Sequence, residues 1–282
     1  LLNFAKAWEK ASSGDTILIG DGTYSGSSYR DLEINAGKSL LIKSRNGPDK
    51  VIFDAGTYGR HLEFRLTDPT ENIDSTLVIE GITFKNGGSQ TEGGSIGFFG
   101  GQFWDPNTQQ YIYKTISTKF VNCIFKNNTA EYNGGAVYMN IASPIFESCV
   151  FDSNTVSTDK TYHIHGGAVY VGRGSPQFRN TTFSANKVLG QHPGTSGGGY
   201  YETNGGAIYF SSQDSTSTKI INCTFKNNSA TALNGSPSGG AIYFGDLYHK
   251  PHHDGDRYIV DRSTFHGNIN SIQSQANNRG GA

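Results

Sequence analysis

Four tyrosines occupy one position of a recurring motif, Gly-Gly-Ala-(Val or Ile)-Tyr. They are Tyr138, Tyr170, Tyr209 and Tyr243. Alternation along a strand places this position on the outside of the fold, with rings on neighbouring strands about 4.8 Å apart. Such a stripe could bind sugars, a covering loop or another subunit. It could instead stabilise the sheet by about 0.5–1 kcal/mol per stacked pair, and the sequence leaves both interpretations open.

Five Asn-x-Ser/Thr sequons could carry N-linked glycans in a secreting eukaryote. They begin at Asn127, Asn180, Asn222, Asn227 and Asn234. Asn127 and Asn227 occupy the same position of a repeat, and Asn180 and Asn222 share another. These positions lie at or beside predicted bends, from which a glycan would project. In such a source we expect at least two of them to be glycosylated; in a bacterium they mean little.

A polysaccharide lyase needs a Lys or Arg base and a group that neutralises the uronate carboxylate, often Ca²⁺ held by Asp and Glu. Asp68, Glu71 and Asp74 share one predicted loop that could serve the second role. The sequence places no basic pair with them on one strand face, and the outward repeat positions are not specialised. A lyase acting on anionic glycans is therefore an alternative, and no catalytic residue is assigned.

Histidines gather in two predicted insertions, where they could bind a metal together with carboxylates. One insertion contains His163 and His165. The other contains His249, His252, His253, Asp254 and Asp256. Tight zinc-type spacing is missing from both, and the second insertion also contains Pro and Gly. We therefore predict solvated loops, no metal and no other cofactor.

Two alternating motifs build the elements that position these residues. Gly-Gly-Ala recurs from residue 134 onwards, with a weaker copy at 93–96 and a last copy at 280–282. Phe-x-x-Asn begins at residues 125, 151, 183, 225 and 265. One pair of motifs forms one unit, and the shortest unit, from Phe125 to Phe151, fits one turn of a solenoid with three short strands. Asn at the end of the second motif is expected at a bend, where stacked amides can form a ladder.

Side-chain alternation assigns the inside of the solenoid. The fourth and sixth positions of the Gly-Gly-Ala unit are always apolar and share one face with each other, as do the two ends of the Cys/Thr/Ser-x-Phe segment. Cys123 and Cys149 fall at one inward position of adjacent coils and are expected to be free thiols. The predicted fold is all-β: a single-stranded right-handed parallel β-helix with an N-terminal capping helix.

The chain is predicted to form one domain, 1–282, as part of a longer chain. Residues 1–14 form the cap, with Leu1, Leu2, Phe4, Ala5, Trp8 and Ala11 on one helical stripe. Residues 15–80 form the first coils, with strands at 16–19, 40–43, 51–54, 61–66 and 77–80. Residues 81–282 form the repeat coils, whose longer units carry polar loops such as 188–202 and 246–258.

The composition excludes several classes of protein. Glycine accounts for 37 of 282 residues, aromatic residues for 12% and charged residues for 17%, a mixture typical of short strands and tight turns. The net charge of −1 gives no sign of the basic surface that nucleic-acid-binding proteins carry. No apolar run reaches the roughly 20 residues of a membrane span. The chain begins at Leu1 without a signal peptide, which is expected of a mature or trimmed portion of a longer precursor.

The alternation of Gly-Gly-Ala-(Ile or Val) with Phe-x-x-Asn over residues 81–282 resembles the paired repeat of the chlamydial polymorphic outer-membrane proteins. It also resembles related β-helical surface proteins of bacteria and protists. The opening segment from Ala11 to Tyr24 is similar to the start of pectate-lyase-like β-helices. The resemblance to the surface proteins implies an adhesive or structural role at the cell surface or outside the cell.

The leading hypothesis is an extracellular, glycosylated structural or adhesive β-helix that forms a subunit of a filament or surface layer. Because the sequence stops at a new Gly-Gly-Ala without a capping element, we expect end-to-end self-association or continuation of the solenoid. The alternatives are a carbohydrate-binding adhesin that uses the tyrosine stripe, and the polysaccharide lyase. Glycans are the expected ligands in both.

Overall fold

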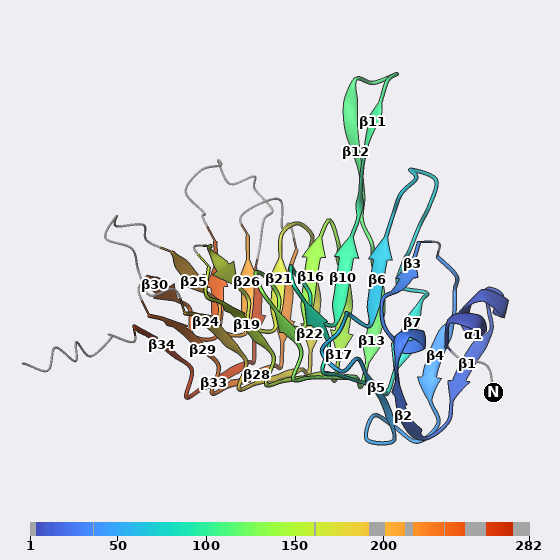
Figure 1. The fold of residues 1–282 in the computed structure, drawn as a ribbon. Coiled ribbons are helices and arrows are strands. Elements are labelled where there is room, and N and C mark those ends of the chain that lie inside the picture. The colour runs from blue at the N-terminus through green and yellow to red at the C-terminus, as the bar shows by residue number, and fades with distance from the viewer. Residues whose placement is uncertain are drawn as a thin grey trace, which may run out of the picture.

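The computed structural model describes residues 4–35, 37–160, 162–191, 201–211, 217–233, 235–245 and 258–272. Short parallel strands stack along one axis into three long sheets around a common core (Figure 1). Sheet 1 contains, in stacking order, β1 (Thr16–Ile19), β4 (Leu41–Ser44), β7 (Val78–Glu80), β13 (Lys119–Val121), β17 (Ile145–Glu147), β22 (Gln177–Arg179), β27 (Lys219–Ile221) and β32 (Ile259–Asp261). Sheet 2 contains β2 (Gly22–Ser25), β5 (Val51–Asp54), β8 (Thr83–Lys85), β14 (Ile124–Lys126), β18 (Val150–Asp152), β23 (Thr182–Ser184), β28 (Thr224–Lys226) and β33 (Thr264–His266). Sheet 3 contains β3 (Leu32–Ile34), β6 (Leu62–Arg65), β10 (Ile96–Phe99), β16 (Val137–Asn140), β21 (Val169–Val171), β26 (Ile208–Phe210) and β31 (Ile242–Phe244).

Repeat positions face each other across consecutive coils, so the register follows the motifs. Phe125 pairs with Phe151 in sheet 2, and Val137 pairs with Val169 in sheet 3. Each strand lies beside the strand one turn earlier and connects to the next sheet, with the right-handed crossover that parallel strands favour. The predicted right-handed parallel β-helix is confirmed.

Two further parallel sheets contribute additional strands to the coils. The predicted pattern of three strands per turn is therefore incomplete. Sheet 4 contains β9 (Gly88–Ser89), β15 (Thr129–Ala130), β19 (Thr155–Thr158), β24 (Lys187–Gly190), β29 (Ser229–Ala232) and β34 (Ile269–Ile272). Sheet 5 contains β20 (Ile164–His165), β25 (Glu202–Asn204) and β30 (Ser236–Ser238). The prediction of a polar loop starting at residue 188 was wrong, because Val188 lies in β24 and is buried in a small second core with Val156 and Ile164.

Stacked phenylalanines fill the main core. Phe151 lies in sheet 2 between Phe125 and Phe183, with ring centroids 4.7 and 4.8 Å away and nearly parallel planes. A second file of rings, from sheet 1, meets this one edge-on, as where Phe146 contacts Phe151 at 5.4 Å. Both arrangements are favourable for aromatic pairs. The inward positions assigned from alternation are confirmed by this core.

An asparagine ladder runs beside the phenylalanines. Asn154 is fully buried, and its Nδ2 donates to Oδ1 of Asn186 at 2.9 Å and to the carbonyl oxygen of Phe125. The predicted ladder is confirmed, and these asparagines do not themselves take a left-handed conformation. The preceding residue takes the left-handed conformation instead, as at Asn127 with φ 54° and Ser153 with φ 59°. This turn points the following Asn inward, where its amide can pair.

The three cysteines are free and buried, as expected for Cys123 and Cys149. Sγ of Cys149 donates to the carbonyl oxygen of Phe120 at 3.6 Å, and burial raises the pKa of its thiol. Cys223 occupies the same inward column two coils further along. The cysteines therefore act as small core residues.

A short helix, α1 (Phe4–Lys10), covers the first coil, together with the 3₁₀ turn η1 (Ser27–Tyr29). Phe4 is buried against Phe53 with ring centroids 5.7 Å apart. Lys38 Nζ caps the end of the helix by donating to the carbonyl oxygens of Trp8 and Ala11 at 2.7 and 2.8 Å. Ala5, predicted on the inner stripe, is exposed, and Leu1 and Leu2 lie outside the described residues.

One hairpin leaves the solenoid. Strands β11 (Gly101–Asp105) and β12 (Gln110–Lys114) pair antiparallel and project from the end of β10 (Figure 1). This hairpin lies outside the repeated motifs and was not predicted. No helix in the part of the chain described here has the length and apolar character needed to cross a membrane.

Candidate functional site

The four tyrosines form a continuous ladder on the outer face of sheet 3. Tyr138 pairs in register with Tyr170, Tyr170 with Tyr209, and Tyr209 with Tyr243. The ring centroids lie 5.3, 5.3 and 5.4 Å apart and the planes differ by at most 9°. The structure places all four rings outside the core and in register, as predicted.

The ladder continues where the tyrosines stop. Gly97 takes the next place in register with Tyr138, and the ring of Phe99 folds over it, 5.5 Å from the ring of Tyr138. The guanidinium of Arg65 lies over the outer side of Phe99, 4.3 Å from its centroid. Sequence reasoning missed Phe99 because it lies outside the repeated tyrosine position.

Face-to-face stacking limits what the inner rings can bind. The two faces of Tyr170 contact Tyr138 and Tyr209, so its edge and hydroxyl group are what remain toward the outside. The rings are also half-buried, and burial, with the charge of Glu92, raises the pKa of Tyr138 to about 12. The ladder therefore supports stabilisation of the sheet, whereas its role as a binding surface stays a prediction.

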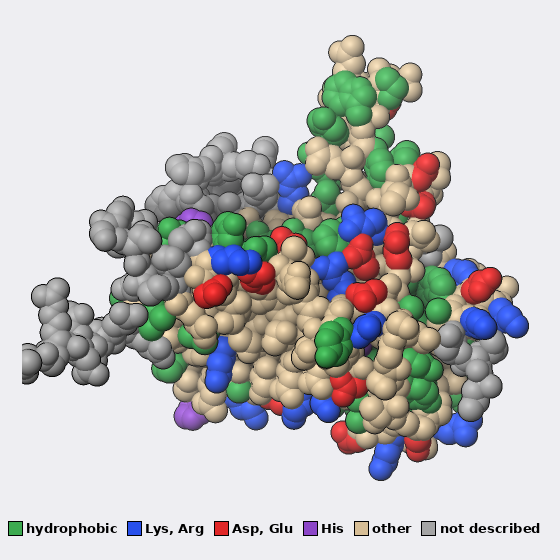
Figure 2. All heavy atoms as spheres, viewed as in Figure 1, with side chains coloured by type: hydrophobic (Ala, Val, Ile, Leu, Met, Phe, Trp, Pro, Cys, Tyr) green, Lys and Arg blue, Asp and Glu red, His purple; other side chains and the backbone are tan. Residues whose placement is uncertain are grey.

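The hairpin presents the most exposed aromatic faces near the ladder. Cross-strand pairing puts Gln102 opposite Tyr113 and Trp104 opposite Tyr111, so these four side chains share one face. Trp104 is 54% exposed and meets Tyr111 edge-on at 5.2 Å. Figure 2 shows apolar side chains gathered on this projection. Exposed aromatic clusters of this kind mark interaction surfaces.

A groove of about 330 Å³ lies between the base of the hairpin and the ladder. It is lined by Gln102, Tyr138, Asn140, Ile141, Tyr170, Gly172, Arg173 and Ser211. The residue two positions after a tyrosine of the ladder is small, as at Gly172. A Cβ added to Gly172 would lie 3.3 Å from the ring of Tyr170. The guanidinium of Arg173 lies over the ring of Tyr113, 5.3 Å from its centroid. The groove and the aromatic face of the hairpin are thus continuous.

The lining of this groove is a mixture of aromatic and polar groups. It combines two tyrosine rings with their hydroxyl groups, two side-chain amides, a serine hydroxyl group and one guanidinium. Among the described lining residues there is no carboxylate, imidazole or thiol, and Arg173 and the two tyrosine hydroxyl groups are the titratable groups present. Aromatic surface with a few polar groups is the usual composition of a small-ligand site.

The sequons within the described residues lie at bends on both sides of the strands of sheet 2. Asn127 and Asn227 follow such strands, and Asn180 and Asn222 precede them; all four are exposed and left-handed, with φ between 51° and 55°. Asn222 Nδ2 donates to Oδ1 of Asn180 at 2.7 Å. Asn234 lies outside the described residues. Glycosylation of the sequons stays a prediction.

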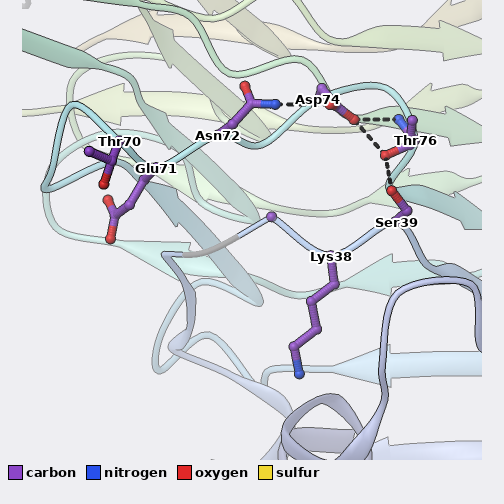
Figure 3. A pocket seen from close by; sticks show the side chains of 8 residues that line it. Lys38, Ser39, Thr70, Glu71, Asn72, Asp74 and Thr76 are labelled. Carbon is purple, nitrogen blue, oxygen red and sulfur yellow. Dashed lines mark hydrogen bonds between the residues drawn. The ribbon is translucent and has the colours of Figure 1, made fainter.

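The acidic loop considered for lyase chemistry borders a pocket of about 320 Å³ (Figure 3). Asp74 accepts hydrogen bonds from the backbone and hydroxyl of Thr76, and these bonds lower its pKa. Glu71 accepts from the backbone of Thr67. Lys38, across the pocket, holds the end of α1. These local bonds order the acidic loop, and the lyase alternative stays a prediction.

The histidines and the chain end complete the predicted features. His163 and His165 lie with ring centroids 6.4 Å apart. The prediction of a solvated loop was wrong for His165, which is buried in β20, and this burial lowers its pKa to about 3. No cluster suited to a metal ion occurs among the residues that the structure describes. The insertion with His249, His252 and His253 lies outside them, as does the last Gly-Gly-Ala, 280–282. Self-association through that end remains a prediction.

Two segments of the chain, residues 122–140 and 222–245, match a family model described as the Chlamydia polymorphic membrane protein (Chlamydia_PMP) repeat. A search of curated proteins finds no match. Among solved structures, pectin methylesterase from Yersinia enterocolitica is similar at 12% identity and a TM-score of 0.32, over 99% of this chain and 93% of that chain. Each matched segment contains one Phe-x-x-Asn and one Gly-Gly-Ala motif. The repeat unit of this β-helix is therefore similar to the Chlamydia polymorphic membrane protein repeat.

Proposed function

We propose that this chain is a cell-surface β-helix that acts as an adhesive, carbohydrate-binding module. The aromatic face of the hairpin carries the proposal: Trp104, Tyr111 and Tyr113 are about half exposed and stand beside a polar groove. Sugars present apolar C–H faces together with hydroxyl groups. Aromatic rings match the first, and amides, hydroxyls and a guanidinium match the second.

The solenoid supplies the rigid support that such a site needs. The hairpin starts directly after β10, whose register with β16 is unbroken from Ile96 to Phe99. Gln102 from the hairpin and Tyr138 from the sheet line the same groove. Sites on regular elements are held more precisely than sites on loops. The match to a repeat named for a membrane protein supports a position at the cell surface.

A glycan array probed with the purified chain tests this proposal. We expect binding to a defined group of glycans, and a loss of about tenfold or more in Trp104→Ala and in Tyr113→Ala. Tyr58→Ala is the matched control, because Tyr58 is 80% exposed and belongs neither to the hairpin nor to the groove. The melting temperatures of all three variants should stay near that of the wild type, since the replaced side chains lie outside the core.

Two results would contradict the proposal. One is the absence of any glycan bound above background by the correctly folded wild-type chain. The other is glycan binding that Trp104→Ala and Tyr113→Ala leave unchanged, which would place the sugar on another surface of the solenoid.

A further inference from the structure

The last described coil exposes side chains that belong to the core. Val260 on β32 and Phe265 on β33 occupy the inward positions of sheets 1 and 2, and they are 43% and 50% exposed. Their counterparts one coil earlier, Ile220 and Phe225, are buried. Two large apolar side chains side by side at one end of the solenoid are typical of an interaction surface.

The first coil has an apolar groove at the opposite end of the solenoid (Figure 1). Its volume is about 740 Å³, and Phe4, Ile17, Tyr24 and Phe53 are among the residues that line it. Helix α1 covers only part of this coil: Phe4 packs against Phe53, whereas Leu18, which also lines the groove, is 49% exposed. An apolar recess of this kind can accept the apolar anchors of a partner.

The register of the sheets relates these two surfaces. Successive in-register pairs carry the inward column of sheet 1 from Ile17 to Val260. The inward column of sheet 2 runs in the same way from Tyr24 to Phe265. The first coil of a second copy, placed in the same register beyond the last coil, would therefore set Ile17 against Val260 and Tyr24 against Phe265. Both receiving residues line the groove.

The backbone edges of the two coils match as well. Because the N–H of Arg45 donates to the carbonyl oxygen of Ile19, strand alternation turns the N–H and C=O groups of Leu18 toward the open edge of sheet 1. On β32 the N–H of Ile259 donates to the preceding coil, so the groups of Val260 face the other open edge. In the stacked register the carbonyl oxygen of Val260 would accept from the N–H of Leu18, which extends sheet 1 across the junction.

We propose that copies of this chain associate head to tail, with Val260 and Phe265 of one copy inserted into the groove beside α1 of the next. The contact is heterologous, because it joins two different surfaces, and its repetition builds a filament. It does not involve the carbohydrate site, which lies on the outer face of sheet 3. The two proposals therefore stand or fall separately.

Sedimentation velocity over a range of concentrations tests the inference. The wild-type chain should form larger oligomers as its concentration rises toward about 0.1 mM. Phe265→Asp and Leu18→Asp should each stay monomeric: the first puts a charge into the apolar groove, and the second faces Asp261 of the neighbouring copy in the stacked register. Tyr58→Asp is the control and should assemble like the wild type, because Tyr58 is 80% exposed and does not line the groove beside α1.

An equimolar mixture of the two monomeric variants identifies the geometry of the contact. Phe265→Asp retains an intact groove and Leu18→Asp retains an intact last coil, so the mixture should form a heterodimer and nothing larger. Circular dichroism shows whether each variant is folded, and Val260→Asp replaces Phe265→Asp if the latter unfolds. A wild-type chain that stays monomeric would overturn the inference. Oligomers of Leu18→Asp alone would also overturn it, because they would indicate a symmetric contact between two last coils.

Discussion

Asn154 and Asn186 are linked by a hydrogen bond of 2.9 Å from Nδ2 to Oδ1, and Asn128 makes the same bond to Asn154. The backbone N–H of Asn154 also donates to Asn186 Oδ1 at 3.0 Å. Every hydrogen-bonding position of the Asn154 amide is thus used inside the solenoid. The ladder fixes the register of neighbouring coils, because a shift by one residue would leave these buried groups unpaired.

Asn154→Ala should therefore destabilise the fold by about 3 kcal/mol or more, since it leaves several buried partners without hydrogen bonds. Denaturant unfolding followed by circular dichroism measures this change. Asn107→Ala, at an exposed position in the hairpin turn, is the matched control and should change the free energy of unfolding by about 0.5 kcal/mol or less. Equal effects of the two substitutions would refute a structural role for the ladder.

Phe151→Ala should cost about 3–5 kcal/mol, because it opens a cavity between Phe125 and Phe183 and removes an edge contact with Phe146. Phe151→Leu keeps most of the volume and should cost less than half as much. Thermal and denaturant unfolding of both variants test the expectation. A loss below about 1 kcal/mol for the alanine variant would mean that the phenylalanine file is not the main core.

His61 should make the fold less stable in mild acid. It is fully buried between Ser95 Oγ at 3.0 Å and the carbonyl oxygen of Phe53 at 2.9 Å. Burial lowers its pKa from 6.5 to about 4, so the unfolded chain takes up the proton first as the pH falls. Its contribution to stability is present above pH 6.5 and is lost between pH 6.5 and 4, by up to about 3 kcal/mol.

Comparing wild type with His61→Gln isolates this effect from that of other titrating groups. The free energy of unfolding is measured at several pH values between 4 and 7. We expect a smaller loss toward low pH in the variant, whatever its stability at neutral pH. Parallel pH profiles would show that His61 is not responsible.

Tyr170 separates the two interpretations of the tyrosine ladder. Tyr170→Ala removes two stacked contacts and should cost about 2 kcal/mol, at about 0.5–1.5 kcal/mol per aromatic pair beyond burial. Tyr170→Phe keeps the stacking and should cost about 1 kcal/mol or less, through the lost bond to Ser211. Urea unfolding gives both values, and similar losses in the two variants would argue against stacking as the stabilising element.

The repeats made most of the coils predictable, because their alternation separates inside from outside at each position. Strands Thr16–Ile19 and Val51–Asp54 occur where the sequence placed them. Strands Gly22–Ser25 and Leu32–Ile34 were missed, because they contain only one and two apolar residues, too few to show a period. The short sheets 4 and 5 were also missed, because strands as brief as Thr129–Ala130 have too few residues to show a period.

The hairpin escaped prediction for a different reason. Its strands are rich in aromatic residues and flank a turn that contains Asp105 and Asn107, which is a recognisable hairpin signal. The segment occurs once in the chain and therefore has no counterpart among the repeats. The contact between Arg173 and Tyr113 could not be predicted either, since it joins an element outside the repeat to a coil two turns further along.

The unbroken register on either side of the hairpin has a consequence for how such a protein diversifies. β10 and β16 pair as closely as strands joined by shorter connections, although the whole hairpin lies between them in the chain. A segment of other sequence can therefore be inserted at the end of a sheet 3 strand without changing how the coils pair. Replacing the hairpin with loops of other sequence would give a set of proteins that share one β-helix and differ in the segment that projects from it.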